Sequence, residues 1–363
     1  MRRFVKWLKL VRKAAPYRSV ILQIFDIIQT KIRVNISPAE YYKFEFYKGG
    51  RTWEEKSRFI GKLGSLYWPY ELNPLKYNAT LTNKYAQKNL LTGFGLPTPR
   101  LMAAVGPHFG IKTLGEFQKF LSGCRQDIVA KPISSRGGHR VLALTCRKGS
   151  FHMAGELYTA ERIWQHMQPD MEKGFLIEEK LSNNRQIGSI YPHSLNCFRV
   201  VTIKLGDQWK TVFPPYLKIG HGNSIVDNVM EDGGILLFLD GKGYAKLAFA
   251  EHLDRQIEHH PDTGAPLAGI RLEGVEEVRE LGLEASRKFS FLGTIGWDIA
   301  LTENGPFIIE GNAMWGGLQD QRFLGGFVTD EMTSHLKKHP LFSRWDRMMM
   351  FPRFFTKMKA FRT

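Results

Sequence analysis

The sequence has few cysteines and no long apolar run. Its 363 residues include three cysteines, Cys124, Cys146 and Cys197, and none belongs to a CxxC pair. An odd number without that spacing argues against a disulfide framework and a cysteine zinc site, and it indicates a reducing compartment. No stretch is apolar enough for a transmembrane helix, and the charges threaded through residues 1–18 predict no secretory signal. The sequence therefore predicts a cytoplasmic protein, with peripheral contact to the inner face of the membrane as a further hypothesis.

Internal repeats, low-complexity tracts and the phosphate loop GxxxxGK[ST] are also absent from the sequence. The last absence excludes a Walker A nucleotide site. Apolar residues make up 43% of the chain, which is typical of a folded globular protein. The length is sufficient for two or three subdomains with substantial cores.

The positive charge of the chain lies at its two ends. The net charge is +16, and residues 1–62 hold 15 Lys/Arg against 5 Asp/Glu. Residues 337–363 hold 8 Lys/Arg against one acid, so the segment between these ends is nearly neutral, at −1. A nucleic-acid enzyme more often spreads its basic patch over the folded core, so no nucleic-acid partner is expected. Basic ends are typical of docking segments for an anionic surface or an acidic partner.

The periodicity of the chain predicts both helices and strands. Residues 1–35 are expected to be helical, because apolar residues recur at helical spacing from Val20 to Ile32. This helix either packs on the body of the protein or lies on a membrane surface. From Lys84 onward, apolar β-branched runs are separated by turn residues and interleaved with helical runs at 114–122, 155–168 and 274–290. The pattern predicts an α+β or α/β protein built around antiparallel hairpins.

The strongest chemical signal is the segment GWDIALTENGPFIIEGN, in which two apolar strands are joined by a turn. Asp298 lies on the first strand, and Glu310 and Asn312 lie two residues apart on the second, so these two point to the same face. If the strands pair as a hairpin, three oxygen ligands converge, and Mg²⁺ prefers such ligands. A hairpin with ordinary polar edges is the alternative.

Two further segments carry charged residues around strand ends. In AKPISSRGGHRVLAL, Lys131 ends a strand before a Ser/Gly-rich loop whose glycines let backbone N–H groups approach an anion closely. A plain hairpin turn is the alternative for this loop. The segment FLIEEKL is either an edge strand with solvated charges or a hinge whose backbone pairs with adenine.

Two later segments add isolated charges. Arg199, in SLNCFRVVTIKL, is flanked by apolar residues, which is costly unless the guanidinium meets an anion or an acid. A structural salt bridge satisfies this requirement equally well. In LKIGHGNSIVDNVMEDGG, Lys218, Asp227 and Asn228 precede a pair of glycines. Without context, this segment is a polar loop between strands.

Taken in order, these segments resemble the ATP-grasp superfamily, which includes glutathione synthetases, D-alanine–D-alanine ligases and ribosomal-protein glutamate ligases. The motifs LNCFRVVT, VDNVMEDGG, HHPDTG and GWDIALTENGPFIIEGN are more closely similar to a bacterial branch called sugar-transfer-associated ATP-grasp, which is associated with polysaccharide or glycan assembly. The resemblance implies an α+β ATP-grasp fold, in which two α+β subdomains grip ATP behind a basic, helical N-terminal extension. The implied domains are residues 1–80 for the extension, 81–185 for the N-terminal and lid subdomains, 186–330 for the catalytic subdomain and 331–363 for a basic aromatic tail.

The resemblance also implies roles for individual residues. Two lysines would bind the ATP phosphates under a closing loop at 134–138, and the backbone at 179–180 would meet adenine. Arg199 and Lys218 would stabilise the transferred phosphoryl group. The implied metal ligands for Mg²⁺, with Mn²⁺ as an alternative, are Asp298, Glu310 and Asn312. The implied ATP-binding residues are Lys84, Lys131, Ser135, Gly137, Gly138, Glu178, Glu179, Lys180, Asn196 and Asn228, and the implied substrate-binding residues are Asp227, Gly233 and Gly234.

The chain departs from the glutamate ligases at two places. Those enzymes carry an acidic residue for the ribose two positions before the arginine, where this chain has Cys197 beside Asn196. Their loop reads Arg-Ser-Asn where this chain reads Val-Asp-Asn at 226–228, and Lys218 matches an arginine only by type. Ribose contact and the handling of phosphate and acceptor are therefore expected to differ.

The resemblance implies an enzyme that joins a carboxylate to an amine or another nucleophile through an acyl phosphate, converting ATP to ADP and phosphate. Its expected partners are a small-molecule or glycan carboxylate and a nucleophilic acceptor, in polysaccharide, glycan or peptide-conjugate biosynthesis. A kinase on the same scaffold and a non-catalytic interaction protein are the alternatives. The retained acids Asp298 and Glu310 argue against the second of these. The basic ends are expected to contact a membrane surface or a glycan-assembly partner.

Overall fold

The computed structural model describes residues 10–61, 69, 72–135, 138–227, 233–250, 255–315 and 321–337. The chain divides into two compact units. The first comprises residues 1–72, 204–213 and 314–363, and the second comprises residues 73–203 and 214–313. Within the described ranges, no helix combines the length and the apolar character that crossing a lipid bilayer requires.

The first unit contains a small helical bundle with an aromatic core. The ring centroid of Phe59 lies 5.0 Å from that of Phe44 and 5.0 Å from that of Phe46. Two of its helices begin at capping boxes, at Ser37 and Thr52, which satisfy the first backbone N–H groups of each helix. The elements of this unit are α2 (Val20–Val34), α3 (Pro38–Lys43), η1 (Phe46–Lys48), α4 (Trp53–Ser57), β8 (Gln208–Thr211), α13 (Gln321–Leu324) and α14 (Asp330–Lys337).

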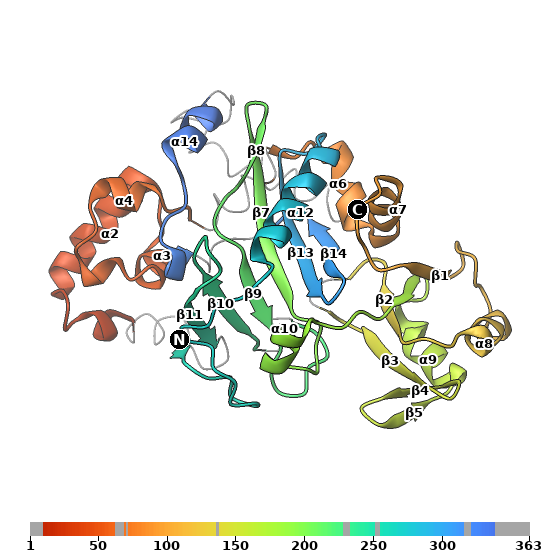
Figure 1. The fold of residues 1–363 in the computed structure, drawn as a ribbon. Helices are drawn as coiled ribbons and strands as arrows, with labels where there is room; N and C mark the ends of the chain where they lie inside the picture. The colour runs from red at the N-terminus through yellow and green to blue at the C-terminus, as the bar shows by residue number, and fades with distance from the viewer. Residues whose placement is uncertain are drawn as a thin grey trace. The chain divides into compact units, whose positions relative to one another are not determined.

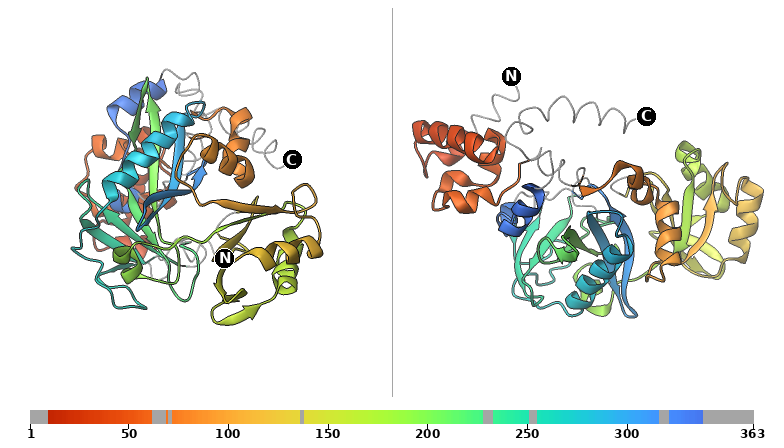
Figure 2. Two further views of the ribbon diagram at one scale, coloured as in Figure 1. Left: turned by 45° about the vertical axis from the view of Figure 1, so that its right-hand side comes forward. Right: turned by 90° about the horizontal axis from the view of Figure 1, so that it is seen from above.

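The second unit contains a six-stranded sheet with the strand order β1-β6-β2-β3-β4-β5. Neighbouring strands are antiparallel throughout. Helices α8 (Leu114–Gly123) and α9 (Ala160–Met167) lie beside this sheet (Figure 2). Their side chains Phe117 and Ile163 are buried in the core that they share with it. The strands are β1 (Leu101–Val105), β2 (Ile128–Pro132), β3 (Leu142–Arg147), β4 (Ser150–Met153), β5 (Glu156–Tyr158) and β6 (Phe175–Glu179).

An eight-stranded sheet follows, with the order β12-β11-β10-β9-β7-β13-β14 and with β8 paired to β7. Helix α12 (Val275–Lys288) covers one face of this sheet (Figure 1). The strands not yet given are β7 (Cys197–Leu205), β9 (Tyr216–Ile219), β10 (Ile235–Leu239), β11 (Ala245–Ala250), β12 (Arg255–Ile257), β13 (Thr294–Thr302) and β14 (Gly305–Asn312). The remaining helices are α6 (Leu75–Thr82), α7 (Lys84–Gly93), η2 (Gln168–Asp170) and α10 (Arg185–Ile190).

The α+β class predicted from the sequence is confirmed, because both sheets are antiparallel and are interleaved with helices. The helices expected at 114–122 and 274–290 correspond to α8 and α12. The helix expected at 155–168 starts later, at Ala160. Residues 156–158 pair with β4 as strand β5, and the Thr159 side chain caps the helix that follows.

Candidate active site

The hairpin that the sequence predicted is formed by β13 and β14. Asp298 lies directly opposite Glu310, and Asn312 lies opposite Gly296. On the other side of β13, Asp298 lies opposite Arg199 of β7. Since residues directly opposite in an antiparallel pair share a face, the two carboxylates, the amide and the guanidinium project from the same side of the sheet.

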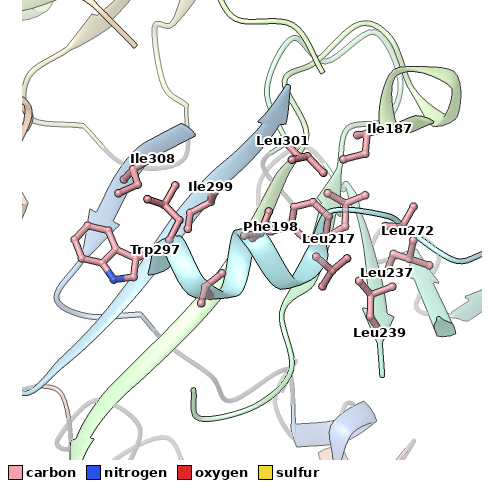
Figure 3. Close-up of a cluster of buried hydrophobic side chains, with 14 of the residues drawn as sticks. Ile187, Phe198, Leu217, Leu237, Leu239, Leu272, Trp297, Ile299, Leu301 and Ile308 are labelled. Carbon is pink, nitrogen blue, oxygen red and sulfur yellow. The ribbon is translucent and has the colours of Figure 1, made fainter. Parts of the chain in front are cut away.

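The opposite face of these strands is apolar. Phe198, Trp297 and Ile308 point toward α12 and join a single core cluster with it (Figure 3). Trp297 is fully buried, and its Nε1 donates to Ser286 Oγ of α12 at 2.8 Å. Strand residues alternate between faces, and a β-bulge in the pairing of β13 with β14, between Asp298 and Ile299, lets Ile308 face α12 while Glu310, two residues later, lies on the polar side.

The charged side chains on the polar face alternate in sign. Arg199 Nε lies 2.8 Å from Asp298 Oδ1, and its second nitrogen donates to Oδ2 of the same carboxylate at 3.2 Å. Lys218 Nζ lies 3.2 Å from Asp298 Oδ1 and 3.3 Å from Asp227 Oδ2. Asp227 Oδ2 also accepts from the backbone N–H of Cys197 at 2.9 Å. The result is a row of two carboxylates and two cations in the order Asp227, Lys218, Asp298, Arg199.

Burial and the neighbouring cations shift the pKa values of the two buried aspartates in opposite directions. Burial by itself raises the pKa of Asp298, but Arg199 and Lys218 outweigh it, so the pKa lies below its usual range. The pKa of Asp227 is raised, chiefly by burial. Lys218 is also buried, which lowers its pKa, yet Asp227 and Asp298 together hold that pKa above its usual value. Lys218 and Arg199 therefore stay positively charged at neutral pH.

The predicted metal ligands lie close to one another at the end of the hairpin. Asn312 Nδ2 lies 3.4 Å from Asp298 Oδ2 and 3.3 Å from Glu310 Oε1. The described residues contain no cluster of three His, Cys, Asp or Glu side chains suited to a metal ion, so the amide of Asn312 would be the third donor. Two carboxylates and an amide suit a hard cation that completes its shell with water and phosphate oxygens. These residues therefore fit Mg²⁺.

A second charged cluster is buried at the six-stranded sheet. Glu178 of β6 lies 2.7 Å from Lys131 Nζ of β2 and 2.9 Å from Lys88 Nζ of α7. Lys88 also donates to Thr98 Oγ1 at 2.6 Å and to the carbonyl of Pro99 at 2.9 Å. Since Glu178 is 3% exposed and β6 is an inner strand, this segment is not a solvated edge strand.

Lys88 was missed by the sequence analysis. It lies four residues after Lys84 on α7, a spacing that places both on one helix face, and this was the available signal. Burial lowers the pKa of Lys88 to about 8, although Glu178 opposes that shift. Burial alone would raise the pKa of Glu178, but Lys131 and Lys88 hold it below its usual range.

Lys84 contacts both the loop that follows β2 and the strand β14. Its Nζ donates to the carbonyl of Ser135 at 2.7 Å and lies 3.7 Å from Glu310 Oε2. The loop that begins at Ser135 also meets the Val226 side chain at Gly138, where a Cβ would lie 2.9 Å from that side chain. Gly138 has φ +70°, so this position favours glycine both sterically and conformationally. Ser135 is thus linked through Lys84 to Glu310 of the hairpin, and Gly138 lies against Val226.

Asn196, predicted to bind ATP, makes its hydrogen bonds within the protein interior. Asn196 is fully buried, and its side chain bonds to Tyr191, Ser194 and Gly220, away from the polar face.

The amide hydrogens of Glu179 and Lys180 bond to the carbonyls of Arg100 and Asp127. An adenine ring at these two residues would have to use their carbonyl oxygens. Gly233 has φ +69°, and it leads with Gly234 into β10. Gly137 and Asn228 lie outside the described residues.

Comparisons with known proteins give one family. A family model described as sugar-transfer associated ATP-grasp matches residues 67–321. No curated protein matches the chain.

Among solved structures, the chain is similar to N5-carboxyaminoimidazole synthase from Aspergillus clavatus, with 13% identity and a TM-score of 0.40, covering 70% of this chain and 51% of that one. It is also similar to an L-amino acid ligase from Bacillus licheniformis, with 16% identity and a TM-score of 0.41, covering 71% and 48%. A D-alanine-D-alanine ligase from Helicobacter pylori shows 13% identity and a TM-score of 0.39, covering 71% and 60%. The chain spans about half the length of the first of these proteins.

Proposed function

Because this chain belongs to the sugar-transfer associated ATP-grasp family, we propose that it uses MgATP to activate a carboxylate and joins it to a nucleophile, in the first place an amine. The observation that carries this proposal is the row of alternating carboxylates and cations on the polar face of β9, β7, β13 and β14. ATP and a carboxylate are both anions, so a site that brings them together must supply cations at fixed positions.

The first step transfers the γ-phosphoryl group of ATP to an oxygen of the substrate carboxylate, giving ADP and an acyl phosphate. This step is needed because a carboxylate would otherwise have to expel oxide. In this proposal, Lys131 and Lys84 bind the nucleotide phosphates, and Arg199 and Lys218 stabilise the transferred group. When bound at Asp298, Glu310 and Asn312, Mg²⁺ would neutralise phosphate charge.

In the second step, the nucleophile attacks the carbonyl carbon of the acyl phosphate. A bond from nitrogen to carbon forms, the bond from carbon to the phosphate oxygen breaks, and inorganic phosphate and a proton leave. Water would attack the same carbon, so the intermediate must be shielded during this step. We propose residues 134–138 as the cover, because the Ser135 carbonyl accepts from Lys84 and Gly138 lies against Val226.

Incubation with MgATP, candidate carboxylates and hydroxylamine tests the reaction class. An acyl phosphate reacts with hydroxylamine to give a hydroxamate, so we expect a hydroxamate and one ADP for each product. A phosphorylated alcohol formed without hydroxamate would instead indicate the kinase. If no ATP is consumed with any of the substrates, the protein is the non-catalytic one.

Replacement of Lys131 tests the phosphate site. We expect Lys131→Met to weaken ATP binding by about 1.5–3 kcal/mol, the contribution of a charged hydrogen bond, measured by calorimetry. Glu178 keeps Lys88 as its partner, so the fold should persist. Lys173→Met, at an exposed lysine paired only to Asp170 in the same turn, is the control and should bind ATP normally. Equal affinity in both variants would remove Lys131 from the ATP site.

We propose that the acceptor is recognised by the segment from Lys218 to Gly234 together with the loop at 259–264. These two segments are joined, because Asp262 Oδ2 accepts from the Gly222 N–H at 2.7 Å and lies 3.2 Å from His221 Nδ1. His260, stacked on Tyr191, lies 3.0 Å from the carbonyl of Gly220. Residues 220–222, close after Lys218 in the chain, are thus in direct contact with residues 260–262.

Asp262→Ala should separate these loops without touching the nucleotide. We expect a several-fold higher KM for the acceptor, with an unchanged Kd for ATP, because one charge-assisted hydrogen bond is lost. The acceptor KM is measured by steady-state ligation with the substrate pair that the hydroxamate assay identifies. The Kd for ATP is measured by calorimetry. An unchanged acceptor KM would place acceptor recognition elsewhere.

We place this reaction in the cytoplasm, where MgATP is available, and in the assembly of a polysaccharide, glycan or peptide conjugate. The family description supports the link to sugar transfer. The substrate would accordingly be a sugar-linked or small-molecule carboxylate.

A further inference from the structure

Helix α2 is packed with its polar side inward. The buried residues of this helix include Gln23, Asp26 and Thr30, which recur at helical spacing. The outward side carries Ile21, Phe25, Ile28 and Ile32, which are 80%, 60%, 52% and 73% exposed. A surface helix of a water-soluble domain normally shows the reverse arrangement, with its apolar stripe toward the core.

Specific bonds hold the polar side of α2 in the interior. Asp26 pairs with Arg18 at 2.6 Å and with Lys56 of α4 at 2.9 Å. Gln23 accepts from the Tyr42 hydroxyl at 2.8 Å and donates to the carbonyl of Arg18 at 2.7 Å. Rotating the helix to bury its apolar side would break the bonds to Lys56 and Tyr42, which belong to other helices. The orientation of α2 is therefore determined by its polar contacts.

The outward residues form one continuous stripe. Ile21, Phe25, Ile28 and Ile32 follow the spacing i, i+4, i+7 and i+11, which is one side of an α-helix. Ile24 and Val20, at its border, are 49% and 47% exposed. Such a stripe is unfavourable in water, and an exposed contiguous apolar surface commonly marks an interaction site.

The exposed charges of the segment that carries the stripe have one sign. Lys31 and Arg33, in the last turn of α2, are exposed, and Arg33 lies over the Trp53 ring. Arg12 and Lys13, ahead of the helix, are exposed as well. The acid of this segment, Asp26, is buried and paired with two cations. The exposed charges of residues 10–34 are therefore all positive.

We propose that α2 lies in the interface of an anionic lipid leaflet, with its apolar stripe among the acyl chains and its cations at the headgroups. An apolar face bordered by cations, with an aromatic residue in the stripe, is typical of interfacial helices. Each exposed cation near an anionic surface adds to the attraction. This binding concerns a surface outside the proposed reaction and does not depend on it.

Charge favours lipid over a second copy of the chain. A symmetric dimer through the stripe would place the same surface on both sides, so the bordering cations of one copy would face those of the other. Like charges across an interface oppose association, whereas anionic headgroups neutralise them. The sequence ahead of α2 continues this composition, with Arg2, Arg3, Lys6 and Lys9 and no acidic residue in residues 1–9.

Vesicle flotation of the full chain tests this proposal. We expect binding to phosphatidylcholine vesicles that contain 30% phosphatidylglycerol, weaker binding to pure phosphatidylcholine, and loss of the difference at high salt. The variant Ile21→Gln/Phe25→Gln/Ile28→Gln/Ile32→Gln should reduce the partition coefficient at least about tenfold, because each side chain gains from leaving water. All four residues point outward, so the thermal melt and the ATP affinity should be unchanged.

Leu157→Gln is the matched control, because Leu157 is a 52% exposed apolar residue on a different element. It should float as the wild type does. A second variant, Arg12→Glu/Lys13→Glu, should remove the preference for phosphatidylglycerol. Equal flotation of the wild type and the fourfold variant would overturn the proposal. So would a wild-type dimer in light scattering that becomes a monomer in the fourfold variant, since a second copy would then cover the stripe.

Discussion

Replacing Glu310 with glutamine should lower the rate of ATP turnover by at least about a hundredfold, the scale for losing a preorganised charge at a reacting group. Glu310 is more accessible than Asp298, with side chains that are 30% and 5% exposed. Its ion pair with Lys84 is 3.7 Å long, so the charge contributes little to folding. The variant should therefore melt within a few degrees of the wild type.

An ADP-release assay at saturating ATP, repeated over a range of Mg²⁺ concentrations, measures this effect. A weaker metal site should also shift the Mg²⁺ concentration at half-maximal rate upward. Glu277→Gln, at an exposed position in the first turn of α12, is the matched control and should turn over ATP normally. Full activity of Glu310→Gln would remove this carboxylate from the metal site.

The same substitution at Asp298 should behave differently. Asp298→Asn removes the charge that neutralises both Arg199 and Lys218, and Asp298 is only 4% exposed. Two buried cations would be left without that partner, so both the turnover rate and the thermal melt should fall. The contrast between the two variants separates the chemical role of the hairpin from its structural role.

Replacing Glu178 with glutamine should cost about 3–5 kcal/mol of unfolding free energy, the range for breaking a buried ion pair. Glu178 is the shared partner of Lys131 and Lys88, and all three side chains are nearly inaccessible to water. Chemical denaturation with a two-state fit measures the loss. The double variant Glu178→Gln/Lys88→Met should recover part of it, because one uncompensated cation is removed.

The difference in unfolding free energy between the wild type and Glu178→Gln should also depend on pH. The pKa of Glu178 is held below its ordinary value of 4.5, so the carboxylate stabilises the fold fully above about that pH. As the pH falls further, the unfolded state takes up a proton first, and the wild type loses its advantage over Glu178→Gln. The gap between the two proteins should therefore narrow as the pH falls below about 4.5. A gap that persists at lower pH would show that the charge is not the stabilising feature.

The predictions for Glu310 and Glu178 concern residues whose surroundings could be predicted from the sequence to different extents. The pairing of β13 with β14 follows from a local pattern, because two apolar strands adjacent in the chain are joined by a turn. The position of Glu310 directly opposite Asp298 does not follow from alternation alone, because it depends on the β-bulge between Asp298 and Ile299. Glu178, in contrast, reads as an ordinary charged residue until β6 is placed between β1 and β2.

By itself, the sequence determined the α+β class, the antiparallel hairpin with its two carboxylates, and the concentration of positive charge at the ends. Each of these depends on residues close in the chain or on composition alone. Only the tertiary structure decided the partners of buried charges, such as Lys88 with Glu178 and Lys218 with two acids, because they come from separate strands and helices. It also decided the direction of α2. Periodicity shows that a helix has two sides, but the buried bonds of Asp26 and Gln23 determine which side faces water.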